Sequence, residues 1–197
     1  MSSQSAEKIA SILERNLSVE NDLGILRPGS NTVSLRSYSK MMYVQPPPLS
    51  AVIEKNKSLG RRGTVIVSCA DPRITPERFL GLEFAEAAIV RNGGGRTRPA
   101  LSSLLALDSL GNTGTIIVVH HTDCGMSYYS ESEFQDRSKA KHPEIDLPVG
   151  EKFGAIVDPE KTVKEDVEYL KSFESWGDVE IAGLVLDTFS GVLKRVV

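Results

Sequence analysis

The chain has 197 residues, of which 40% are hydrophobic and 25% charged, and its formal net charge is −3 at pH 7. These values are typical of a single globular domain with a sizeable core. The charge argues against nucleic-acid binding as the main function, because such a surface needs clustered lysine and arginine. No apolar run approaches the ~20 residues of a membrane span, and the first residues lack the charged-then-apolar order of a secretory signal.

We therefore expect no membrane partner and an intracellular protein, cytoplasmic or, as the alternative left open, mitochondrial. In a reducing compartment the two cysteines are expected to be thiols, metal ligands or catalytic groups rather than a disulfide.

The first 48 residues are expected to form a helix followed by an arm. Residues 6–17 predict a short amphipathic helix that needs an apolar surface to cover. Its apolar residues are Ile9, Ile12, Leu13 and Leu17. Residues 18–48, with their glycines and a final run of three prolines, are interpreted as an extended surface segment. We accordingly divide the chain into an N-terminal helix and extended arm, residues 1–48, and a single α/β domain, residues 49–197.

Strand and helix patterns alternate through the rest of the chain. Apolar runs predict buried strands at residues 64–69, 87–90, 115–119 and 179–186, and residues 192–197 predict a short edge strand in a hairpin. Helical patterns cover residues 49–58, 75–81, 99–110 and 160–173. The polar segment 127–158 shows no clear period and is expected to hold helical pieces and loops. This alternation predicts an α/β fold with a mainly parallel central sheet flanked by helices.

Chemically active side chains follow two of the predicted strands. Cys69, Asp71 and Arg73 come at the end of the first strand, and His121 and Cys124 follow the third. Ligands bind outside the carboxyl ends of parallel strands, and both sets lie at that edge. Two thiolates, an imidazole and a carboxylate suit tetrahedral zinc. The alternative is that both cysteines are small buried hydrophobic residues and the histidine is a satisfied loop residue.

These motifs resemble those of the β-class carbonic anhydrases. That family carries Cys-x-Asp-x-Arg, an Arg-Asn-x-Gly-Gly turn and His-x-x-Cys-Gly, which are matched here by Cys69 to Arg73, Arg91 to Gly95 and His121 to Gly125. The resemblance is close over residues 60–126 and looser up to the strand near Ile181. It implies that Cys69, His121 and Cys124 bind one Zn²⁺ per subunit.

The resemblance also leaves Asp71 with two roles. In one, Asp71 is the fourth zinc ligand and the enzyme is closed. In the other, Arg73 holds Asp71 by a charge-assisted pair, water enters, and Asp71 accepts its hydrogen bond. Both residues are therefore assigned to the catalytic set, and the state of Asp71 stays open.

Other features near these motifs have two interpretations each. Gly93-Gly94-Gly95 with Arg96 is either a phosphate cradle or, as we prefer, a structural turn, because it matches neither common phosphate-binding pattern. His120 is either a proton relay or a packing residue, and the Tyr128-Tyr129 pair either lines the pocket or belongs to the core. Asp123 is expected to orient a ligand.

The resemblance implies hydration of carbon dioxide to bicarbonate. Gly93 stands where the family usually has Ala, His120 replaces a common Gly, and segment 127–158 is atypical, so carbonyl sulfide hydrolysis on the same zinc is the alternative. A non-enzymatic alternative keeps a closed structural zinc, and a nucleotide-binding module is a further alternative from the fold alone. The resemblance implies a homodimer or homotetramer in which the N-terminal helix lies across a neighbouring subunit.

Overall fold

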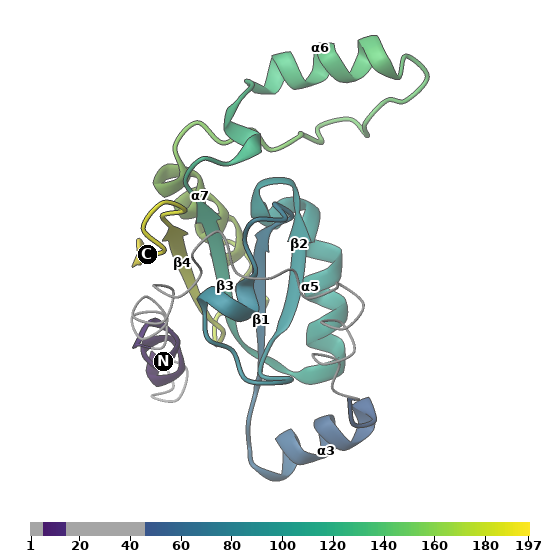
Figure 1. Ribbon diagram of the computed structural model, residues 1–197. Coiled ribbons are helices and arrows are strands. Elements are labelled where there is room, and N and C mark those ends of the chain that lie inside the picture. The colour runs from purple at the N-terminus through teal and green to yellow at the C-terminus, as the bar shows by residue number, and fades with distance from the viewer. Residues whose placement is uncertain (1–5, 15–45) are drawn as a thin grey trace, which may run out of the picture.

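The computed structural model describes residues 6–14 and 46–197. Its centre is a five-stranded sheet in the order β2-β1-β3-β4-β5 (Figure 1). The first four strands are parallel to their neighbours: β1 (Gly63–Cys69), β2 (Ala88–Asn92), β3 (Thr113–His121) and β4 (Glu180–Leu186). The short β5 (Leu193–Arg195) is antiparallel to β4. The predicted α/β fold with a mainly parallel sheet is confirmed, and so is the antiparallel edge hairpin.

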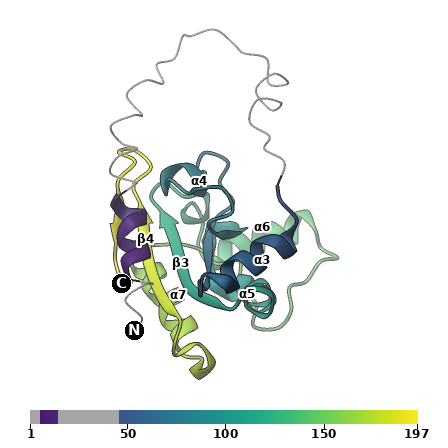
Figure 2. The same ribbon diagram turned by 90° about the horizontal axis from the view of Figure 1, so that it is seen from below.

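Helices cover both faces of the sheet and form two hydrophobic cores. On one face, α5 (Thr97–Gly111) and α7 (Pro159–Lys171) pack on the strands, with Leu104 and Val167 among the buried residues. The other face is covered by the helix of residues 6–14 and by the short α4 (Pro76–Phe79). Figure 2 shows this layered arrangement from below. Because apolar strands are covered on both faces, they appear in the sequence as continuous apolar runs.

Two helices lie outside these layers. Neither α3 (Leu49–Ser58) nor α6 (Glu131–Lys141) buries a side chain. In Figure 1, α6 projects beyond the carboxyl ends of the strands. A capping box at Ser130 and Glu133 begins α6 and explains how a helix without apolar periodicity forms inside the polar segment 127–158. Three short 3₁₀ turns complete the fold: η2 (Gly93–Gly95), η3 (Gly125–Ser127) and η4 (Glu174–Trp176).

The N-terminal helix packs on the sheet of its own chain. Ile9 and Ile12 are fully buried in the same cluster as Leu184 and Leu193, and Leu13 packs against it. The expectation that this helix lies across a neighbouring subunit is therefore not met in this arrangement, because its apolar face is already covered. Leu17 and residues 18–45 of the expected arm lie outside the described residues. The division of the chain at residue 48 stays a prediction.

No helix in the described ranges, residues 6–14 and 46–197, is both long and apolar enough to cross a membrane.

Candidate metal centre

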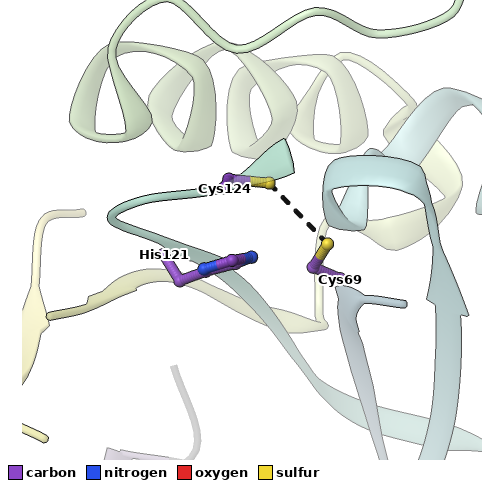
Figure 3. Close-up of side chains that lie close together, drawn as sticks. All are labelled: Cys69, His121 and Cys124. Atoms are coloured by element: carbon purple, nitrogen blue, oxygen red, sulfur yellow. Dashed lines mark hydrogen bonds between the residues drawn. The ribbon is translucent and has the colours of Figure 1, made fainter. Parts of the chain in front are cut away.

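The carboxyl ends of two adjacent strands bring three side chains together. Cys69 is the last residue of β1 and His121 the last of β3, and the two strands pair up to Ser68 and Val119. After β3 the chain turns back, so Cys124 faces the same edge (Figure 3). The sequence predicted this convergence of Cys69, His121 and Cys124, although β3 continues further into the polar residues than expected.

The three side chains have the spacing of a tetrahedral metal site. Their ligand atoms lie within 4.8 Å of one another, and all three residues are buried. The two Sγ atoms are 3.8 Å apart and the cysteines are free. A tetrahedron with Zn–S bonds of ~2.3 Å has an edge of ~3.8 Å, which matches this separation. A disulfide would need ~2.05 Å, so the sulfur spacing fits metal ligands and no covalent bond.

The hydrogen bonding of His121 leaves one ring nitrogen free for a metal. Its Nδ1 lies 2.9 Å from the carbonyl oxygen of Thr122. A carbonyl only accepts hydrogen bonds, so Nδ1 carries a hydrogen, and in the neutral imidazole Nε2 is the nitrogen with the free lone pair. Nε2 is buried and without a hydrogen-bond partner. An unpaired buried acceptor is costly unless something binds it, and the carbonyl–histidine arrangement is typical of metal-bound imidazoles.

The pKa values of the two thiols are shifted in opposite directions. The hydrogen bond from Cys124 lowers the pKa of Cys69, and this effect exceeds the opposing effect of burial. The pKa of Cys124 is raised by the same hydrogen bond and by burial. The backbone at Asp71 and Gly94 lowers the pKa of Cys69 further. The site is thus built to hold negative charge on sulfur, which is the form that binds metal.

The Gly93–Gly95 turn is a structural part of this centre. Gly94 and Gly95 have φ of +76° and +69°, in the left-handed region that favours glycine. A β-carbon on Gly95 would lie 2.9 Å from the backbone nitrogen of Cys69. The interpretation as a structural turn therefore agrees with the geometry. Arg96 is paired with Asp166, its Nε lying 2.7 Å from Oδ2, and is not free to hold a phosphate.

Asp71 is turned toward Arg73 and is not part of the metal-binding group. Within the described residues that group contains only Cys69, His121 and Cys124. The Arg73 guanidinium donates to both carboxylate oxygens of Asp71, with Nη2 at 2.7 Å from Oδ2 and Nε at 3.0 Å from Oδ1. These hydrogen bonds lower the pKa of Asp71 to about 2. Of the two roles considered for Asp71, the geometry is that of the Arg73-paired one.

Asp123 holds the other side of the Arg73 guanidinium. Its Oδ2 lies 2.7 Å from Nη1 of Arg73, and its carbonyl oxygen accepts from Nη2 at 2.7 Å. Asp123 has a positive φ of 51°, which is uncommon for a residue other than glycine. We expected Asp123 to orient a metal ligand, but its side chain instead contacts Arg73. It therefore helps to fix the cation that pairs with Asp71.

The remaining candidates lie apart from the metal-binding trio. His120 alternates with His121 along β3, so it faces α7, where it is fully buried and hydrogen-bonded to Thr162 and Asp166. This placement agrees with a packing role. Tyr128 is 69% exposed, so it is not a core residue, and its hydroxyl lies 3.4 Å from Asp123. Tyr129 packs edge-on against Phe134.

The mainly parallel sheet, with two cysteines and a histidine at its carboxyl edge, defines an α/β protein with a candidate metal centre. Comparison with models of known families shows to which family this chain belongs. A family model described as carbonic anhydrase matches residues 64–192, and the similar proteins named below include β-carbonic anhydrases. The chain belongs to the β-class carbonic anhydrase family, as the sequence motifs predicted.

Relatives with two different activities match similar lengths of the chain. β-Carbonic anhydrase 1 of Mycobacterium tuberculosis is 39% identical over 71 residues, which cover 36% of this chain and 44% of the relative. Carbon disulfide hydrolase of an Acidianus species is 39% identical over 69 residues, or 34% of each chain. The matched segment thus spans less than half the length of these curated relatives.

The fold has solved counterparts. A carbonic anhydrase from Streptococcus mutans has a TM-score of 0.62 at 28% identity and is covered over 100% of its length by 78% of this chain. A metal-free carbon disulfide hydrolase structure has a TM-score of 0.59 at 23% identity, covering 82% of this chain and 91% of that one. At this identity, the similarity to the carbon disulfide hydrolase structure shows a shared fold and nothing about activity.

Proposed function

We propose that this protein is a zinc-dependent carbonic anhydrase that hydrates carbon dioxide to bicarbonate. The observation that carries the proposal is the grouping of Cys69, His121 and Cys124 within 4.8 Å, with Asp71 held away from it by Arg73. Three protein ligands with a fourth position left for water are typical of catalytic zinc sites, whereas structural sites have four.

The protein residues have separate tasks in this proposal. Zinc, when bound, acts as a Lewis acid that makes water a nucleophile near neutral pH. Cys69, Cys124 and Nε2 of His121 hold the metal, and the Thr122 carbonyl fixes the orientation of the imidazole. Asp71, ionised and held by Arg73, accepts a hydrogen bond from the attacking water and orients it toward the carbon of the substrate.

Carbonyl sulfide hydrolysis is the second candidate, and two observations support it. The chain is similar to carbon disulfide hydrolases over about as many residues as to β-carbonic anhydrases. In addition, the Met126 thioether occupies the space above Gly93: a β-carbon there would lie 3.3 Å from its Sδ. Methionine is polarizable and adaptable, and Met126 stands two residues after Cys124, so we infer that it is a candidate contact for a substrate containing sulfur.

A closed, structural zinc is the least supported alternative. It requires Asp71 as a permanent ligand, whereas both Asp71 oxygens are engaged by Arg73. The proposal also includes a homodimer or homotetramer and a cytoplasmic location, with a mitochondrial one as the alternative.

The test is zinc content together with two assays on one preparation: stopped-flow hydration of carbon dioxide and release of hydrogen sulfide from carbonyl sulfide. Fast hydration with slow sulfide release supports the carbonic anhydrase. Slow hydration with efficient sulfide release supports the second candidate. Bound zinc without hydration between pH 6.5 and 9, and without sulfide release, would refute both. Cys69→Ser is the matched variant, and it should lose zinc and both activities.

A further inference from the structure

A buried carboxylate on α7 connects two of the chain segments that form the metal centre. The side chain of Asp166 is only 3% exposed, and it accepts hydrogen bonds from two different parts of the fold. Nε2 of His120 lies 3.1 Å from Oδ2, and Thr97 Oγ1 donates to Oδ1 at 2.9 Å. Arg96 adds an ion pair, with Nε at 2.7 Å from Oδ2.

Each of these partners is next to a residue of the metal centre. His120 immediately precedes His121 on β3. Arg96 follows the Gly93–Gly95 turn, whose Gly95 lies so close to the end of β1 that a β-carbon there would be 2.9 Å from the backbone nitrogen of Cys69. The backbone of Arg96 is tied to Asn92 at the other end of that turn, by hydrogen bonds of 2.8 and 2.9 Å. A shift of Asp166 would therefore move both the strand end that holds His121 and the turn that contacts Cys69.

The network is charged, and its members are buried except for Arg96, whose side chain is 16% exposed, so its geometry is strongly determined. Burial acts to raise the pKa of Asp166, but the hydrogen bond from His120, the charge of Arg96 and the hydrogen bond from Thr97 lower it below its ordinary value. A carboxylate only accepts, so Nε2 of His120 must carry a hydrogen. The ring is held on its other side by Thr162, whose Oγ1 is 2.9 Å from Nδ1. Removing one member of such a network leaves its partners unpaired in a dry environment.

We propose that Asp166 is a positioning residue for the metal centre, acting through His120 on β3 and through Arg96 on the glycine turn. It touches neither the metal ligands nor the substrate. Its role is to fix the relative position of His121 and Cys69 from the opposite face of the sheet. This inference rests on the proposed metal site but not on which substrate the enzyme uses.

The test compares zinc affinity and cobalt spectra of full-length Asp166→Asn and wild-type protein. The amide keeps the shape, but its NH₂ faces His120 and Arg96 Nε if it replaces Oδ2, or Thr97 and Arg96 Nη2 if it replaces Oδ1. The zinc dissociation constant, measured by competition with a chromophoric chelator, should rise about tenfold, as is usual when outer partners of metal ligands are altered. The visible absorption bands of the Co²⁺-substituted protein, which report ligand geometry, should change in position or intensity.

Two further variants keep the inference falsifiable. Thr97→Val removes one hydrogen bond to Asp166 with little change in volume, and it should weaken zinc binding less than Asp166→Asn, by a few fold. Glu160→Gln, on the same helix, breaks only an exposed ion pair with Lys194 and should leave both readouts unchanged.

The outcomes separate this inference from the proposed function. Tight zinc binding by the wild type with unchanged affinity and cobalt spectrum in Asp166→Asn and Thr97→Val, even at a lower melting temperature, would overturn the positioning role alone. A wild type that binds no zinc would overturn the metal centre and this role with it. Altered affinity and spectrum in Asp166→Asn, without hydration activity in the wild type, would support the role and refute only the reaction.

Discussion

Arg73 holds Asp71 by both carboxylate oxygens, at 2.7 Å from Nη2 to Oδ2 and 3.0 Å from Nε to Oδ1. Asp123 holds the same guanidinium from its other side, at 2.7 Å. Bidentate pairing of this kind fixes direction as well as distance. In the proposed mechanism it keeps Asp71 ready to accept a hydrogen bond from water and keeps it off the metal.

Replacing Arg73 by Gln should release Asp71. We expect carbon dioxide hydration to fall by at least about tenfold, because an unheld carboxylate orients water poorly and is free to bind the metal. Stopped-flow hydration and the spectrum of the Co²⁺-substituted variant provide the measurement. Arg195→Gln is the control, because it breaks an ion pair with Glu180 that involves neither Asp71 nor Asp123. Wild-type activity in Arg73→Gln would show that the pair has no part in the reaction.

The Asp71–Arg73 pair should stabilise the fold at neutral pH and lose its effect only in strong acid. The pKa of Asp71 is lowered from 3.8 to about 2, so the contribution is complete above the ordinary value and disappears as the pH falls through about 2. The measurement is urea unfolding of metal-free wild type and Asp71→Asn between pH 7 and pH 2.5. Their difference in unfolding free energy should stay constant down to about pH 4 and then shrink. A difference that already shrinks between pH 6 and pH 5 would contradict the lowered pKa.

Gly95→Ala should destabilise the protein and weaken metal binding. The new β-carbon would lie 2.9 Å from backbone atoms of Ser68 and Cys69, at a φ of +69°. We expect an unfolding free energy lower by about 1–3 kcal/mol or more, from strain of this kind. Gly111→Ala is the matched control, because a β-carbon there meets nothing within 4 Å. Urea unfolding and zinc competition measure the two effects. Equal unfolding free energies and equal zinc affinities in the two variants would contradict a role for the close approach between the turn and Cys69.

Ile12→Ala tests whether the N-terminal helix packs on its own chain. Ile12 is fully buried there, so the truncation should reduce the unfolding free energy by about 2–5 kcal/mol. Because the contact is within one chain, the loss should not depend on protein concentration. Melting temperatures over a hundredfold range of concentration are the measurement, with the exposed Ile145→Ala as control. A loss confined to low concentration would instead place the helix on a neighbouring subunit.

Local patterns in the sequence predicted the strands, most of the helices and the trio of Cys69, His121 and Cys124. They did so because apolar runs reveal buried strands, and parallel strands end at one edge. The length of β3 was underestimated, because its last residues are two histidines that pair within the sheet like apolar residues.

Long-range polar pairings were not predictable from local patterns. Asp166 lies 70 residues from Arg96 and 46 from His120, so local patterns cannot name its partners. Its spacing from Val163 and Leu170 does place it on the apolar face of the helix, which is the one sequence signal that it is buried. The state of Asp71 likewise depends on Asp123, which meets Arg73 only after β1 and β3 are paired. The packing of Ile9 and Ile12 on their own sheet was missed because an amphipathic pattern does not specify which surface covers it.

X-ray absorption at the zinc edge tests the central claim most directly. The account predicts one zinc per chain in the wild type, with two sulfur ligands at ~2.3 Å and one imidazole nitrogen at ~2.0–2.1 Å, the fourth ligand being a light atom. Cys69→Ser should lose the metal or one of the two sulfur contributions. A wild-type protein without zinc, or with zinc bound only by nitrogen and oxygen, would contradict the assignment of Cys69, His121 and Cys124 as the metal centre.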